Sequence, residues 1–393
     1  MSERQLKVLL ANSGSEFVGG SEHSLLGLVR QFVRSDDVHA IVTVPRAGSL
    51  SRAVEEAGGE WRAVPTARWT PFDPHTFRSK LWRARMIGAG LQDVPAWTRL
   101  IRQTDADVVM TNTITSPVPA VASKVARVPH VWCIREFASL DHDLRYALGE
   151  PVSQRLIAWL SAAVVANSRA VAAHYSPPVR ADRMHVIFPG ISVPPVTPNR
   201  IEHGELRILF LGRLTTQKGT EVAVRAAAAL AAGPGRTVLR MVGPIDAEHR
   251  EELEQLARSL DASDVVELPG PTKQPATALE WCNVVLVCSP FEAFGRVTAE
   301  ALTSGRPVVA IRSGGSPELV EDGVTGYLVD PDDVDGLCAA LERARDPVTL
   351  RELSANAARL NGGRFTESDS ACQFADLFAS GVRRSRRGAR ARR

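Results

Sequence analysis

The stretch NVVLVCSPFEAFGRVTAEALTSGRPVVAIRSG, residues 283–314, contains the pattern that decides the fold. It begins with a run of apolar, β-branched residues, which is typical of a strand buried on both faces. Residues 296–305 have helix-forming content, and Gly305 predicts where that helix stops. A second apolar run then begins at Arg306. The order strand, loop, helix, strand predicts a parallel βαβ unit.

The same alternation of apolar runs and helical stretches recurs along the chain, which indicates an α/β fold. The strands predicted for the first half are Lys7–Ser13, His39–Val44, Trp61–Pro65, Asp107–Asn112, His130–Glu136, Ala163–Ser168 and His185–Gly190. Those predicted for the second half are Arg207–Arg213, Thr237–Gly243, Val265–Gly270, Asn283–Pro290, Arg306–Gly314 and Gly326–Pro331. The Pro-rich stretch Ile191–Glu205 separates the two sets and is typical of a stiff linker. We therefore expect two Rossmann-like domains with parallel sheets.

Domain boundaries follow from the linker and from the C-terminal composition. We expect an N-terminal domain over residues 1–195 and a C-terminal domain over residues 196–365. A helix over residues 366–382 is expected to pack back toward the N-terminal domain. Residues 383–393 consist almost entirely of arginine and small residues, so this tail is predicted to be disordered. Its composition favours a solubilising role, and contact with anionic lipid headgroups stays open as the alternative.

Composition excludes several classes of protein. The net charge of +3 is too small to indicate a nucleic-acid-binding protein, so no nucleic-acid partner is expected. The N-terminus lacks the apolar core of a signal peptide, and the apolar run Leu156–Ser168 is too short to span a bilayer. The five cysteines show no CxxC or zinc spacing. We expect a cytoplasmic protein, with a peripheral position at the inner face of the membrane as the alternative.

Two acidic residues stand eight positions apart in the deciding stretch, Glu292 and Glu300. Glu292 follows a predicted strand, at the sheet edge where open α/β folds bind ligands. Glu300 falls about one turn into the next predicted helix. Gly295 lies between them and permits a tight turn, and the helix that follows offers free N–H groups. The two acids therefore belong to different elements and need not perform the same task.

This stretch resembles the E-x7-E motif of the retaining glycosyltransferases of family 4, which have the GT-B fold of two Rossmann-like domains facing each other across a cleft. Further segments are similar to that family in the same order: Gly19–Leu28, Ala166–Tyr175, Leu211–Gly219 and Ser313–Pro331. The resemblance covers nearly the whole chain, and its second half is the more specific part. It implies a sugar transfer from a nucleoside diphosphate donor, UDP- or GDP-linked, with retention of configuration.

The resemblance assigns roles to most of the candidate residues. Arg213 and Lys218 are implied to stabilise the departing diphosphate, a task for which cations near a strand end are suited. Glu292 is implied to bind the sugar hydroxyls and Glu300 the ribose hydroxyls. The remaining expected donor contacts are Gly19, Gly20, Gly270, Phe294, Gly295, Arg296 and Val297. No metal and no cofactor besides the donor is expected, because the arginine–lysine pair would replace a metal ion.

The first half departs from the family pattern. Many relatives carry a histidine after the strand that begins at His130, and this chain has Arg135 and Glu136 at that place. Arg135 is a candidate for stabilising the transition state, with Glu136 orienting it or the acceptor. An ion pair between the domains is an equally good interpretation. His130 itself is expected to be structural.

The function predicted from the sequence is a glycosyltransferase with a nucleotide sugar and a sugar, glycan or lipid-linked acceptor as its partners. Two alternatives stay open. One is a catalytically silent subunit that binds nucleotide sugars, which the missing histidine motivates. The other is a GT-B epimerase or phosphorylase acting on sugars.

Overall fold

The computed structural model describes residues 5–17, 19–70, 80–141, 144–193 and 205–390, with the backbone alone for residues 80–82 and 383–390. The chain divides into two compact units. Unit 1 consists of Met1–Gly190 together with Thr366–Arg393, and unit 2 consists of Ile191–Phe365. The expected boundary between residues 195 and 196 lies outside the described residues, as does most of the predicted linker.

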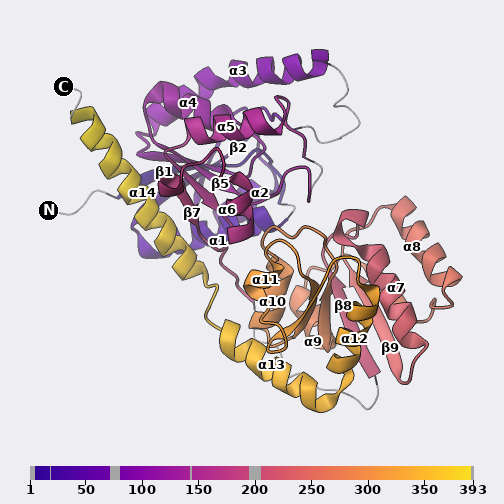
Figure 1. The fold of residues 1–393 in the computed structure, drawn as a ribbon. Helices are drawn as coiled ribbons and strands as arrows, with labels where there is room; N and C mark the ends of the chain where they lie inside the picture. Colours follow the sequence, from indigo (N-terminus) through magenta and orange to yellow (C-terminus); the bar gives the residue numbers. More distant parts are fainter. Residues whose placement is uncertain (1–4, 18, 71–79, 142–143, 194–204, 391–393) are drawn as a thin grey trace. The chain divides into compact units, whose positions relative to one another are not determined.

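Unit 1 contains a seven-stranded parallel sheet with the order β3-β2-β1-β4-β5-β6-β7 (Figure 1). Its strands are β1 Leu6–Ala11, β2 Val38–Val44, β3 Glu60–Ala63, β4 Val108–Asn112, β5 His130–Ile134, β6 Ala163–Ala166 and β7 Met184–Val186. Its helices are α1 Gly20–Ser35, α2 Ser49–Glu56, α3 Lys80–Gln103, α4 Val118–Ala126, α5 Glu150–Leu160, α6 Arg169–Tyr175, the 3-10 turn η2 Ala181–Arg183, and α14 Glu367–Arg390. Each predicted strand of this half is present.

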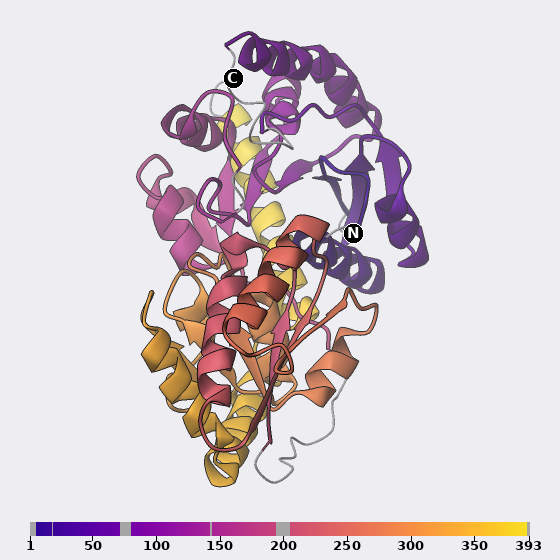
Figure 2. The ribbon, with the colours of Figure 1, turned by 90° about the vertical axis from the view of Figure 1, so that its right-hand side faces the viewer.

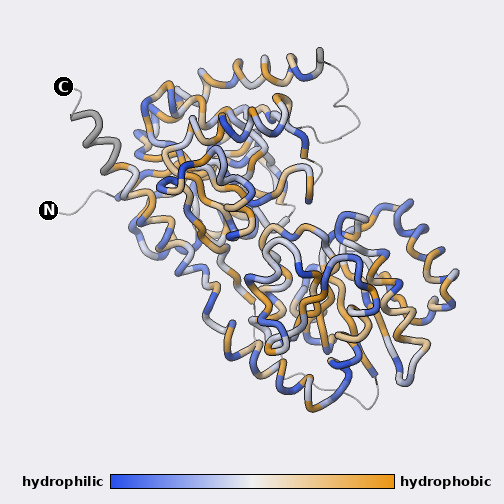
Figure 3. Tube along the Cα trace, viewed as in Figure 1, coloured by the Kyte–Doolittle hydropathy of each residue, from blue (hydrophilic) through white to orange (hydrophobic). Residues whose placement is uncertain are grey.

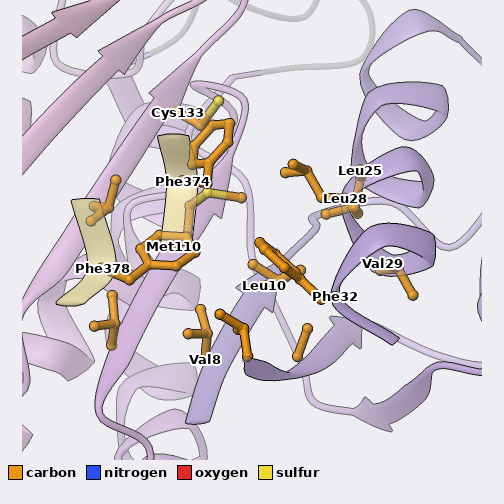
Figure 4. Close-up of a cluster of buried hydrophobic side chains, with 14 of the residues drawn as sticks. Val8, Leu10, Leu25, Leu28, Val29, Phe32, Met110, Cys133, Phe374 and Phe378 are labelled. Carbon is orange, nitrogen blue, oxygen red and sulfur yellow. The ribbon is translucent and has the colours of Figure 1, made fainter. Parts of the chain in front are cut away.

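Both faces of the unit 1 sheet are covered by helices, which explains why its strands are apolar at almost every position. Val8 and Leu10 of β1 point to the face covered by α1, α2 and α14, and their buried cluster is drawn in Figure 4. Leu9, between them in sequence, points to the opposite face, where Trp97 of α3 is completely buried. Figure 3 shows mostly hydrophobic colours along the strands and alternating hydrophilic and hydrophobic colours along the helices.

Helix α14 returns to unit 1 after the chain has completed unit 2, and it lies beside α1. Phe374 and Phe378 bury their rings in the core below α1 (Figure 4). Glu367 forms an ion pair with Arg30 of α1. A Cβ on Gly27 would lie 2.8 Å from the Glu367 carboxylate, so this glycine lets α14 approach α1 closely.

The stretch predicted to be a disordered tail, from Arg383 onward, follows the anchored part of α14. Helix α14 continues to Arg390, and only residues 391–393 lie outside the described residues. Arginine and alanine both have high helix propensity, so the tail extends a helix that the preceding residues already anchor.

Unit 2 contains a six-stranded parallel sheet with the order β10-β9-β8-β11-β12-β13. Its strands are β8 Glu205–Leu211, β9 Arg236–Val242, β10 Val266–Gly270, β11 Val284–Val287, β12 Val308–Ile311 and β13 Gly326–Val329. Its helices are the 3-10 turn η3 Thr216–Lys218, α7 Thr220–Ala231, α8 Ala247–Ser259, α9 Pro275–Trp281, α10 Arg296–Thr303, α11 Ser316–Leu319, α12 Val334–Arg345 and α13 Pro347–Asn361.

Helices α7, α8 and α12 cover one face of the unit 2 sheet with a continuous apolar core. Helix α10 packs against β11, β12 and α13. Figure 2 shows the parallel strands of unit 2 between their helices. The fold class predicted from the sequence, α/β with two parallel Rossmann-like sheets, is confirmed. In each unit the carboxyl ends of the strands meet at one edge, where such folds bind ligands.

Candidate functional site

The loop that carries Glu292 follows β11 at the carboxyl edge of the unit 2 sheet. Its position is set by the loop after β12, because the Gly315 N–H donates a 2.6 Å hydrogen bond to the Glu292 carbonyl oxygen. A Cβ on Gly314 would lie 2.1 Å from that same oxygen, and Gly314 has a φ of 55°. Only glycine fits this approach. The two glycines after β12 thus hold the backbone of Glu292.

A second close backbone approach brings Lys218 to the same place. Gly219 follows η3 with a φ of 73°, and a Cβ there would lie 2.3 Å from the Cys288 carbonyl oxygen at the end of β11. The absent side chain lets the start of α7 press against the loop after β11. Lys218, the residue before Gly219, therefore reaches Glu292.

Lys218 and Glu292 form an ion pair in which Lys218 Nζ lies 2.9 Å from Glu292 Oε2. Their side chains are 22% and 17% exposed, so both groups can still be reached from solvent. A cation beside a carboxylate at a strand edge can bind a phosphate with the first and sugar hydroxyls with the second. The structure brings together these two predicted site residues, which are 74 positions apart in sequence.

Arg213 and Gly270 lie at the same edge, on neighbouring elements. Arg213 is exposed, two residues beyond β8, and makes no hydrogen bond or ion pair through its side chain among the described residues. Gly270 ends β10 with a φ of 90°, and its carbonyl oxygen accepts a hydrogen bond from the Gly243 N–H. No contact joins Arg213 or Gly270 to the Lys218–Glu292 pair within the part of the chain that the structure describes.

Helix α10 begins directly behind this loop. Gly295 precedes its first turn with a φ of 93°, so the predicted tight turn is present. Arg296 is the first residue of the helix, and its Nε lies 2.8 Å from Oε1 of Glu300. Burial raises the pKa of Glu300, and the positive charge of Arg296 acts in the opposite direction.

The other two residues predicted on this segment are less accessible. Phe294 is only 4% exposed, and its ring packs edge-on against Phe365 with centroids 5.7 Å apart. Its backbone, rather than its ring, remains the candidate ligand group. Val297, in the first turn of α10, is half-buried.

In unit 1, Gly19 and Gly20 open α1, but the first amide is already engaged. The Gly19 N–H donates a 3.0 Å hydrogen bond to Glu22 Oε2, and the Ser21 hydroxyl donates to the same oxygen. A carboxylate at the third helical position caps the helix in this way. An anionic ligand that used the Gly19 N–H would therefore have to displace Glu22, a feature that the glycine pattern alone did not indicate.

Arg135 and Glu136 lie just beyond β5 and are 8% and 7% exposed. Arg135 Nε donates a 2.7 Å hydrogen bond to Asn112 Oδ1, and the Arg135 N–H donates to Glu136 Oε2. Asn112 ends β4 and donates in turn to Asn12, which follows β1. The Arg135 guanidinium is thus held in a fixed orientation at the carboxyl edge of the unit 1 sheet.

This network includes residues that the sequence analysis did not single out, namely Asn12, Asn112, Asn167 and Arg68. Asn167 Nδ2 donates to the Arg135 carbonyl oxygen. Burial lowers the pKa of Arg68, and the charges of Glu136 and Glu22 oppose this, which places these side chains in one electrostatic group. A signal was present: an asparagine ends β4 and directly follows β1 and β6, in the stretches VMTN, LLAN and VVAN.

His130 lies at the start of β5 and is 2% exposed. Its Nε2 lies 2.8 Å from the Thr111 hydroxyl. Burial lowers the pKa of His130 to about 3, so the ring is neutral. The environment of His130 fits the structural role expected for it.

Each half of the chain is similar to a known protein family. The family model described as Glycosyltransferase Family 4 matches residues 18–193, and the model described as Glycosyl transferases group 1 matches residues 197–359. Residues 18–193 and 197–359 are thus each similar to a glycosyltransferase family. Together with the paired parallel sheets, this gives the GT-B fold that the E-x7-E resemblance implied.

Named relatives of these glycosyltransferase domains are matched over part of their length. D-inositol 3-phosphate glycosyltransferase of Acidothermus cellulolyticus is 36% identical over 191 residues, 44% of this chain and 42% of that protein. The protein of the same name from Corynebacterium diphtheriae is 35% identical over 215 residues, 50% of each chain. The chain spans about half the length of the curated relatives it matches.

Solved structures agree with the glycosyltransferase fold over nearly the whole chain. Anabaena Alr3699/HepE, crystallised with UDP and glucose, has a TM-score of 0.75 and 22% identity, with 96% of this chain and 100% of that chain covered. Sucrose-phosphate synthase from Thermosynechococcus elongatus has a TM-score of 0.73 and 18% identity, with 96% and 99% covered. At these identities the likeness shows the fold.

Two further properties of the described residues concern metal binding and membrane-spanning helices. Within them, no group of three or more His, Cys, Asp or Glu side chains is arranged to hold a metal ion. None of the helices described is both long and apolar enough to cross a membrane.

Proposed function

We propose that this protein transfers a sugar from a UDP- or GDP-linked donor to a hydroxyl group of an acceptor bound by unit 1. The transfer proceeds with retention of configuration and without an essential metal ion. The observation that carries the proposal is the ion pair of Lys218 and Glu292 at the carboxyl edge of the unit 2 sheet. Support also comes from the two family models and from the HepE structure, whose description names UDP and glucose.

In this proposal the ion pair opens when the donor binds. The diphosphate carries more negative charge than one carboxylate, so Lys218 turns from Glu292 to the phosphate oxygens. Arg213, which is exposed and extends from the end of β8, adds a second cation. Glu292 is then released to accept hydrogen bonds from the sugar hydroxyls. As the sugar–phosphate bond breaks, the two cations stabilise the charge that develops on the leaving diphosphate.

The acceptor side belongs to unit 1 in this proposal. Arg135 is held by Asn112, so its guanidinium is oriented before the substrate arrives. Such a fixed cation stabilises developing negative charge more effectively than a mobile one. The acceptor class is a sugar, glycan or lipid-linked hydroxyl. The relatives named for D-inositol 3-phosphate add a phosphorylated polyol to the acceptors that should be tried.

The proposal is tested by donor screening followed by a transfer assay. Nucleotide sugars are compared by thermal shift, since a ligand that binds the folded state raises its apparent stability. The donor found is then incubated with candidate acceptors, with and without EDTA, and the anomeric configuration of the product is read by NMR. Wild-type protein is compared with Glu292→Gln and with Glu205→Gln, a control whose carboxylate is 19% exposed and paired with Arg207 at the opposite sheet edge.

The alternatives give different results in the same experiment. A silent binding subunit binds the nucleotide sugar but releases no nucleotide with any acceptor. An epimerase or phosphorylase changes the sugar or needs phosphate, without an acceptor hydroxyl. Sugar transfer that survives in Glu292→Gln at the wild-type rate would contradict the assignment of this edge as the donor site.

We further propose that unit 1 contacts anionic membrane lipids, which would place the protein at the membrane surface. Trp159 of α5 is 62% exposed, and Lys124 Nζ of α4 lies 4.8 Å from the centre of its ring. Arg155 and Arg183 line a groove of about 490 Å³ beside Trp159. Exposed aromatic and basic side chains in one patch suit a lipid headgroup layer.

Co-sedimentation with vesicles tests this contact. Wild-type protein should sediment with vesicles that contain phosphatidylglycerol and stay in solution with phosphatidylcholine alone. Trp159→Ser should weaken sedimentation, whereas Val348→Ser, which removes a 54% exposed apolar side chain from unit 2, should not. Equal sedimentation of all three proteins would contradict the proposed surface.

A further inference from the structure

Arg296 and Glu300 occupy one face of the first turns of α10, behind the Glu292 loop. Gly295 ends the loop in the left-handed region, so the helix starts at Arg296 itself. Residues four positions apart on a helix are neighbours. Arg296 Nε accordingly lies 2.8 Å from Glu300 Oε1.

The two oxygens of the Glu300 carboxylate are used differently. Oε1 is paired with Arg296, while Oε2 has no hydrogen-bond partner among the described residues. The Glu300 and Arg296 side chains are 16% and 19% exposed, so the carboxylate is largely withdrawn from water. One oxygen is therefore held by a charge, and the other remains open to a ligand.

Arg296 is also the sole charged group that acts on Glu300 in the described residues. None of the elements packed against α10, namely α11, α13, β11 and β12, contributes a charge that shifts the pKa of Glu300. Burial raises this pKa, and Arg296 opposes the rise both by its charge and by its hydrogen bond. Without Arg296, the carboxyl group would bind a proton at a higher pH.

Helix stability does not explain this pair. A cation in the first turn is unfavourable, because the helix N-terminus is itself positive. The order is also the less favourable one, since an acid that precedes a base by four residues stabilises a helix better than the reverse. Arg296 therefore stands where a helix alone would disfavour it, next to the carboxylate that the donor site uses.

We infer that Arg296 is a positioning residue, which holds Glu300 as an ionised acceptor with Oε2 presented to the ribose hydroxyls of the nucleotide. The inference rests on the proposed function and deepens it. It separates the tasks of the two acids further: Glu292 is released by its cation when the donor binds, whereas Glu300 keeps its cation throughout.

Calorimetric titration of UDP and GDP tests this inference, with wild-type protein, Arg296→Leu and Arg296→Lys at pH 6.0 and 8.5. At pH 6.0, Arg296→Leu should bind the nucleotide about tenfold more weakly, the loss expected for one hydrogen bond to a charged acceptor. A carboxyl group with a raised pKa is more fully ionised at pH 8.5 than at pH 6.0, so the difference from wild type should shrink at the higher pH. Arg296→Lys keeps the charge and should restore most of the affinity at pH 6.0.

Titration of the 2′-deoxy and 3′-deoxy nucleotides measures the preference for the ribose hydroxyls. This preference would not change if Arg296 had only a structural role. Wild-type protein should prefer the full ribonucleotide, and Arg296→Leu should lose part of that preference at pH 6.0 and regain it at pH 8.5. Arg207→Leu is the control, because it removes an arginine that is 3.0 Å from Glu205 at the opposite edge of the same sheet. Arg207→Leu should have the same nucleotide affinity and the same preference for the ribonucleotide as wild type at both pH values.

Two results would overturn the inference, and they are distinguishable. In the first, wild-type protein binds UDP or GDP and Arg296→Leu binds it with equal affinity at both pH values. Arg296 then does not position Glu300, while the proposed function stands. If wild-type protein binds neither nucleotide, the inference fails together with the proposed donor site.

Discussion

Lys218 Nζ lies 2.9 Å from Glu292 Oε2, although the two residues come from different strand–helix units of the same sheet. The pair exists because Gly219 lets the start of α7 contact the end of β11. In this pair the positive charge of Lys218 and the negative charge of Glu292 neutralise each other. Removing Glu292 should therefore change nucleotide binding and turnover in different directions, whereas removing Lys218 should weaken nucleotide binding.

Glu292→Gln should lower kcat/KM for sugar transfer at least about tenfold, because the amide replaces a charged acceptor of the sugar hydroxyls. The affinity for UDP or GDP alone should stay equal or rise, since Lys218 no longer has a competing carboxylate. Enzyme kinetics and calorimetry measure the two quantities. A parallel loss of nucleotide affinity would show that Glu292 does not act on the sugar.

Gly219→Ala should destabilise unit 2 by at least about 2 kcal/mol, because a Cβ would lie 2.3 Å from the Cys288 carbonyl oxygen at a φ of 73°. Urea titration followed by the intrinsic fluorescence measures the change. Gly363→Ala is the matched control, since nothing lies within 4 Å of a Cβ at that position. Equal stability of the two variants would contradict the close approach.

His130 should make unit 1 less stable in mild acid. Its pKa is lowered to about 3 in the folded state and is about 6.5 when unfolded, so the unfolded chain binds the extra proton. Stability is therefore lost as the pH falls below about 6.5, by about 3 kcal/mol at pH 4.5. Urea midpoints of wild type and His130→Gln at pH 7.0 and 4.5 test this. The variant should lose less stability on acidification, and parallel losses would contradict a neutral buried ring.

Arg135→Lys should lower the rate of transfer about tenfold while the affinity for UDP or GDP and the free energy of unfolding change little. Lysine keeps the charge, but it lacks the guanidinium that Asn112 orients at 2.7 Å. A large loss of stability with unchanged turnover would favour a structural ion pair instead.

The strands could be predicted because each one is marked by a local run of apolar residues. Runs such as VVLV of β11 are apolar at every position, as a sheet covered on both faces requires. The start of α10 after Gly295 could also be predicted from local sequence. Glycine is the residue that most readily adopts the left-handed conformation found just before this helix. The resemblance then implied roles for residues at the strand ends, and these roles stay predictions.

What the sequence did not reveal depends on contacts between distant residues. Two such contacts form only when the strands lie side by side in the sheet. One is the close approach of Gly219 to Cys288, and the other is the hydrogen bond from the Gly315 N–H to the Glu292 carbonyl oxygen. The asparagines that orient Arg135 end separate strands, so their hydrogen bonds are invisible in a linear pattern. The helical tail after Val382 depends on α14 being anchored by its aromatic residues in unit 1.

The most direct test of the account is the calorimetric titration of UDP and GDP into wild-type protein and Lys218→Ala. We predict that wild-type protein binds one of these nucleotides, and that Lys218→Ala binds it at least about tenfold more weakly, as expected for the loss of a charged phosphate contact. Equal binding by both proteins, or no binding of either nucleotide by the wild type, would contradict the central claim that this edge of unit 2 holds the donor diphosphate.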